Sequence, residues 1–103
     1  MYFIQYEIRP APTSALFYLA GGAIANCFIQ ASSPEKAQKL ALENFKEQGW
    51  EVVSLEDGPF IAPRDNYLDD DEWLQWFDEA LQSGACYIFH QWPPEAQDGD
   101  QSH

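Results

Sequence analysis

The sequence has few positive charges. Five of its 103 residues are lysine or arginine, against 17 aspartates and glutamates, so the formal net charge is -12 at pH 7. Nucleic acids and anionic membranes attract proteins mainly through cationic side chains that displace counterions. We therefore expect neither nucleic acid nor membrane among the partners. The same charge would attract a basic protein, although an acidic surface that only keeps a protein soluble has the same composition.

Long apolar segments are also missing. No uninterrupted apolar run approaches the ~18 residues that cross a bilayer as a helix. The N-terminal stretch MYFIQYEIR has no basic segment followed by a long apolar one. The two cysteines, Cys27 and Cys86, lie in apolar runs without CxxC spacing, which favours buried, reduced thiols. These features predict a cytoplasmic protein.

Familiar catalytic and metal-binding motifs do not occur: the sequence has no HExxH, no paired CxxC and no G-x-S-x-G. His90 alternates with Cys86 along one expected strand, and Cys27 could lie on a neighbouring strand, so a three-ligand metal site is conceivable. The interpretation we favour is a histidine near the sheet end beside two packed thiols. We predict no catalytic residue, no metal ligand and no cofactor.

What the chain does have is enough apolar material for one core, since 46% of its residues are hydrophobic and 16% are aromatic. We expect a single compact domain over residues 1–92 and a disordered acidic tail at residues 93–103. Residues 16–19 are left open between a short strand and a packed loop, because two glycines follow them.

Alternating apolar and polar residues predict strands at residues 2–9, 23–30, 50–55 and 85–92. After the third of these, Asp57-Gly58 predicts a turn into a short antiparallel return or packed loop at residues 59–61. A serine-proline start at residues 32–34 predicts a first helix that runs to about Gln48.

The second helix begins in the acidic stretch DDDEWLQWFDEAL, where Asp69 can act as the cap and Glu72 can close a capping box. Its aromatic residues fall on one face at helical spacing, which indicates a helix that faces the core. Because this apolar face is wide, Trp73 or Trp76 could instead be exposed as an anchor for a partner.

Arg64 stands in the most loop-like interior segment, beside Asp65, Asn66 and Tyr67. An arginine in a loop can bind a carboxylate or a phosphate through two parallel hydrogen bonds. Pairing with Asp65 or with the acids that follow is the simpler interpretation, because the negative charge is dense there.

The order of elements predicts an α+β two-layer sandwich: a mainly antiparallel or mixed sheet of about four to five strands with two helices, ferredoxin-like or a permuted relative. The unit from residue 23 to residue 55 resembles half of a split βαβ arrangement, with a right-handed crossover if its two strands are parallel.

Charge and size favour a non-enzymatic protein-interaction module. It would either bind a basic partner, as immunity or inhibitor proteins do, or associate with itself as a homodimer. The alternative is a small-molecule-binding or enzymatic domain with a pocket near Pro59–Tyr67. The candidate ligand or partner contacts are Arg64, Tyr67, Trp73, Trp76, Asp78, Glu79 and His90.

Overall fold

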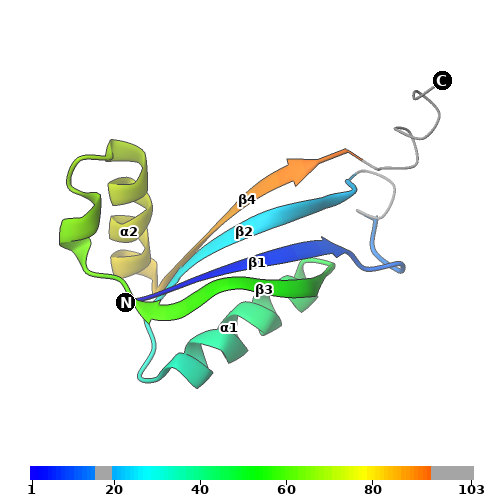
Figure 1. Cartoon of the computed structure of the whole chain (residues 1–103). Coiled ribbons are helices and arrows are strands. Elements are labelled where there is room, and N and C mark those ends of the chain that lie inside the picture. The colour runs from blue at the N-terminus through cyan, green and yellow to red at the C-terminus, as the bar shows by residue number, and fades with distance from the viewer. Residues whose placement is uncertain (16–19, 94–103) are drawn as a thin grey trace.

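The computed structural model describes residues 1–15 and 20–93, which form one four-stranded sheet and two α-helices (Figure 1). Residues 16–19 and the predicted tail from residue 94 onward lie outside the described residues. In chain order the elements are β1 (Tyr2–Pro10), β2 (Gly22–Ile29), α1 (Pro34–Glu47), β3 (Trp50–Ile61), the 3-10 turn η2 (Arg64–Tyr67), α2 (Asp71–Ser83) and β4 (Ala85–Trp92).

The strands lie in the order β3-β1-β2-β4, and each neighbouring pair is antiparallel. Because β2 and β3 both pair with β1, they run parallel to each other on either side of it, and α1 connects them. This is the split βαβ unit that the sequence predicts. The predicted α+β class, with a mainly antiparallel sheet of four strands and two helices, is confirmed.

One face of the sheet packs against α1. Successive residues of a strand point to opposite faces, so the even-numbered residues of β1 share this face with the odd-numbered residues of β2. They pack against Ala37, Ala41 and Phe45 of the helix. The residues that β1 and β2 bury here include Ile4, Tyr6, Ile8, Ala25, Cys27 and Ile29.

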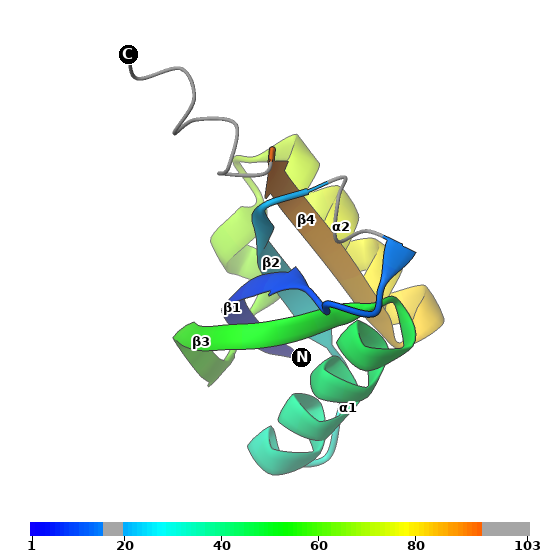
Figure 2. The ribbon, with the colours of Figure 1, turned by 90° about the vertical axis from the view of Figure 1, so that its right-hand side faces the viewer.

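The opposite face packs against α2, near the end of the sheet where β1 begins. Figure 2 shows this helix behind β4, and Figure 1 shows it apart from α1. Phe28 is fully buried there, and its ring centroid lies 5.3 Å from that of Tyr67 and 5.8 Å from those of Trp73 and Phe77. One residue of β2 therefore holds both η2 and α2 on the sheet, and each helix makes its own two-layer contact with the strands.

The cap of α2 lies one residue later than predicted. Asp70, not Asp69, has the extended backbone of a cap, and its Oδ1 accepts a hydrogen bond from Trp73 N at 3.2 Å. The capping box between Asp69 and Glu72 is therefore wrong. Because three aspartates follow one another, local sequence identifies the type of cap but not its position.

No described helix is long and apolar enough to span a membrane.

The predicted turn at Asp57-Gly58 is also wrong. β3 runs without reversal from Trp50 to Ile61 along an edge of the sheet. The dipeptide lies at one of three register shifts in its pairing with β1, where β3 carries extra residues. Gly58 has a φ of 81°, the left-handed conformation that a turn glycine also adopts, so a bulge and a turn share this signature.

Gly58→Ala should destabilise the protein more than Gly84→Ala. Both glycines have positive φ, 81° and 96°, so either change carries the left-handed penalty of about 1–2 kcal/mol. A Cβ at Gly58 would also overlap the carbonyl oxygen of Phe3, whereas nothing lies within 4 Å of one at Gly84. In urea denaturation we expect Gly58→Ala to lower the free energy of unfolding by at least about 3 kcal/mol. Equal losses would contradict the close approach of β1 to this bulge.

Candidate functional site

Negative charge is concentrated on one side of the described structure. The stretch from η2 through α2 contains a single cation, Arg64, whereas α1 carries all three lysines of the chain together with three glutamates. The acidic residues of this stretch are Asp65, Asp69, Asp70, Asp71, Glu72, Asp78 and Glu79. Since α1 and α2 pack on opposite faces of the sheet, the acidic surface and the balanced surface are separated in space.

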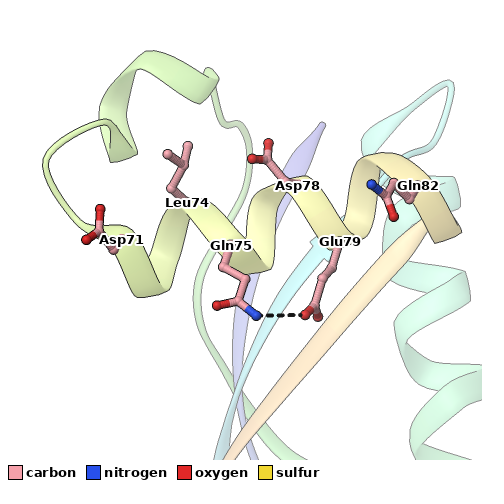
Figure 3. Close-up of a pocket in the computed structure, with 6 residues that line it drawn as sticks. All are labelled: Asp71, Leu74, Gln75, Asp78, Glu79 and Gln82. Atoms are coloured by element: carbon pink, nitrogen blue, oxygen red, sulfur yellow. Dashed lines mark hydrogen bonds between the residues drawn. The ribbon is translucent and has the colours of Figure 1, made fainter.

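The outer side of α2 forms a shallow depression of about 380 Å³ (Figure 3). Its lining comes from α2 alone and consists of Asp71, Leu74, Gln75, Asp78, Glu79 and Gln82. Leu74 is half-buried, with Asp71 and Asp78 about one helical turn before and after it. An apolar side chain between two carboxylates suits a lysine or arginine, whose methylene stem is apolar and whose head is charged.

Arg64 of η2 forms an ion pair with Asp78 of α2. Its Nε and a terminal nitrogen donate to the two carboxylate oxygens of Asp78 at 2.9 and 3.1 Å, which is a bidentate pair. The hydrogen bond raises the pKa of Arg64 and lowers that of Asp78. The arginine is thus engaged by an acid that follows it in the sequence, Asp78 and not Asp65. The pair holds η2 beside α2.

A second concavity, the aromatic groove, lies where η2 and the start of α2 meet the sheet. Its volume is about 330 Å³, and its lining consists of Phe3, Phe60, Asn66, Tyr67, Asp70 and Trp73. The Tyr67 and Trp73 rings are nearly parallel, 6.0 Å apart at an angle of 11°. Phe3, almost fully buried, contacts Phe60 and Trp73 with centroid separations of 5.4 and 5.9 Å.

The groove lies in the region where the sequence places a small-molecule pocket, but its composition differs. Tyr67 lines it, whereas Arg64 and His90 do not. His90 is exposed on β4, opposite Ile24 of β2. Trp76, the other proposed anchor, packs in the α2 layer with its ring centroid 5.1 Å from that of Trp73. Arg64, Tyr67 and His90, which would have formed the small-molecule pocket, therefore do not converge.

The two cysteines lie on opposite faces of the sheet, Cys27 under α1 and Cys86 under α2. Burial raises the pKa of Cys27 to about 12. Cys86 Sγ donates to Glu79 Oε2 at 3.5 Å, and burial together with this carboxylate raises its pKa to about 11. The described residues contain no group of three metal-ligating side chains, so Cys27, Cys86 and His90 do not form the conceivable metal site.

Several groove residues were missed by sequence reasoning, and the reason is topological. Phe3 and Phe60 are direct partners in the β1–β3 ladder, but the turn predicted at Asp57-Gly58 breaks that ladder before Phe60. For Asp70 the sequence indicates only a place in an acidic helix start. The register between β1 and β3 brings these residues together, and no local sequence pattern specifies that register.

Comparison with protein families, with curated proteins and with solved structures found no match.

Cys86 should react faster when Glu79 is neutralised. Glu79→Gln removes the negative charge that disfavours the thiolate, so the pKa of Cys86 falls from about 11 and the thiolate fraction at about pH 8.5 rises. We expect alkylation by iodoacetamide, followed by peptide mass spectrometry, to accelerate several-fold, with a ceiling of about tenfold per pKa unit. Cys27 is the internal reference and should stay unreactive in both proteins. An unchanged Cys86 rate would show that Glu79 does not control this thiol.

Proposed function

We propose that this protein is a non-enzymatic interaction module that binds a basic protein through the outer surface of α2. Proteins of the immunity or inhibitor type, which cover a basic toxin or nuclease, are one concrete form of this function. The observation that carries the proposal is the segregation of charge: α1 balances its lysines with glutamates, whereas η2 and α2 hold seven acids against Arg64.

The α2 surface has the chemistry of a basic-protein site. Arg64 neutralises only Asp78, and the depression keeps two exposed carboxylates, Asp71 near Leu74 and Glu79 on the other side of the helix (Figure 3). A partner's lysine or arginine could lay its stem on the leucine and place its head between carboxylates. Exposed charges of this kind accelerate encounter and select the partner more than they raise affinity, so binding should depend strongly on salt.

A homodimer is the second candidate, and exposed apolar residues on the edge strand β3 favour it. Val53, Leu55 and Ile61 are all exposed there. The three register shifts of β3 make this edge irregular, which opposes regular pairing with another strand. Light scattering of the purified protein decides this point, because a monomer at high concentration would exclude the dimer.

We expect the protein to bind a basic protein through the α2 surface and to lose this binding when the charge of that surface is removed. Immobilised protein should retain a basic protein from a cell lysate, and moderate salt should release it. Once that partner is identified by mass spectrometry and purified, we expect Asp71→Asn combined with Glu79→Gln to weaken it by about tenfold in surface plasmon resonance, mostly through slower association.

The matched control is Glu43→Gln combined with Glu47→Gln, which removes the same charge from α1. If only net charge matters, the two double variants will weaken binding equally, and the assignment to α2 fails. Retention of no basic protein, or of partners whose binding ignores salt, would reject the proposed function as a whole.

A further inference from the structure

The aromatic groove combines ring faces with a carboxylate at its rim. Phe60 is 41% exposed, and Tyr67 and Trp73 are partly exposed, so their rings are accessible above the buried Phe3. Asp70 is exposed at the edge, and its cap hydrogen bond to Trp73 N uses only Oδ1. The second oxygen, Oδ2, takes no part in that bond.

We propose that the aromatic groove binds the guanidinium group of an arginine side chain from the basic partner, stacked on the exposed rings and paired with Asp70. This inference rests on the proposed function and names the chemistry by which the partner is recognised. The arginine would serve as the anchor of the interface, and the outer surface of α2 would supply the surrounding charge.

Charge and ring electrostatics require the ligand to be a cation. The faces of aromatic rings carry partial negative charge and attract cations within about 6 Å of the ring centroid. Asp70 adds a full negative charge, and Asp69 and Asp71 on either side of it increase the local potential. An anion would be repelled, and a neutral apolar group would gain no attraction from the carboxylate.

The shape of the groove favours arginine among cations. The groove is open, since Phe60, Asn66 and Asp70 at its border are all exposed. A planar guanidinium can lie flat on an open aromatic surface and still donate in its own plane to a carboxylate. A lysine ammonium is compact and strongly hydrated, and an alkylated ammonium needs a box of rings on several sides. The side-chain carbonyl of Asn66 offers a further acceptor.

The groove and the α2 depression both include residues from the start of α2. Asp70 and Trp73 line the groove, and the residues that follow each of them, Asp71 and Leu74, line the α2 depression. One partner that covers the first turn of the helix can therefore reach both concavities. An aromatic anchor bordered by exposed charge is the usual composition of an energetically dominant contact.

Two short peptides test this directly: acetyl-Gly-Arg-Gly-amide and its citrulline counterpart, which has the same shape without the charge. Each is titrated into ¹⁵N-labelled protein, and the indole N–H of Trp73 and the amides of residues 66–73 are followed by NMR. We expect the arginine peptide to saturate these signals with a Kd of about 1 mM, and the citrulline peptide to bind at least about fivefold more weakly. Equal shifts from both peptides would overturn the proposal.

Matched variants place the site. Asp70→Asn should abolish most of the binding while keeping the helix cap, because asparagine caps as well as aspartate. Asp69→Asn, which removes a neighbouring charge that does not line the groove, should weaken binding much less than Asp70→Asn, because it lowers only the local potential. Phe60→Ala should weaken the arginine peptide, and Ile61→Ala, the next residue of β3 and also exposed, should not. Equal effects within either pair would reject the groove.

A titration with tetramethylammonium tests whether the groove prefers another cation, and partner binding by the variants tests the groove separately from the α2 surface. If tetramethylammonium binds the groove more tightly than the arginine peptide, the site is one for alkylated ammonium and the assignment to arginine is wrong. If a salt-sensitive basic partner binds normally to Asp70→Asn and Phe60→Ala but not to the α2 double variant, the proposed function stands and the groove proposal fails. If the peptide binds but no basic partner exists, the proposed function alone fails.

Discussion

The register between β1 and β2 determines the arrangement of everything else. Phe3 lies opposite Phe28, and both rings are buried on the face that packs against α2. Ile4 lies opposite Cys27, and both side chains are buried on the face that packs against α1. A slip by one residue would exchange the two faces, because side chains alternate along a strand. Both helices, and with them the groove and the acidic surface, depend on these two central strands being buried on both sides at this end of the sheet.

The sequence was most informative where chemistry is local. Strand alternation, the proline and serine at the start of α1, and the glycine at the end of α2 all lie within a few residues of the structure they specify. The same local evidence was misleading at Gly58, since a bulge and a turn require the same backbone conformation. It also could not choose among three consecutive aspartates, where the cap depends on how the helix packs.

The candidate site was less accessible from sequence because long-range pairing assembles it. Phe3 and Phe60 are far apart in the chain and meet only through the ladder between β1 and β3. Arg64 and Asp78 form their ion pair only because η2 and α2 pack beside each other on Phe28. Asp70 both caps α2 through Oδ1 and lines the groove, and only the cap has a sequence signature.

The separation of charge between the two helices gives the described part of the molecule an electric dipole moment. All three lysines lie on α1, and the densest group of carboxylates lies on η2 and α2, on the other side of the sheet. A dipole experiences a torque in the field of any positively charged surface, so the molecule rotates before contact and presents α2 first. At low ionic strength, fewer encounters between the two proteins then occur in the wrong orientation, so association is faster. This increase in the association rate disappears once salt shortens the Debye length below the width of the sheet.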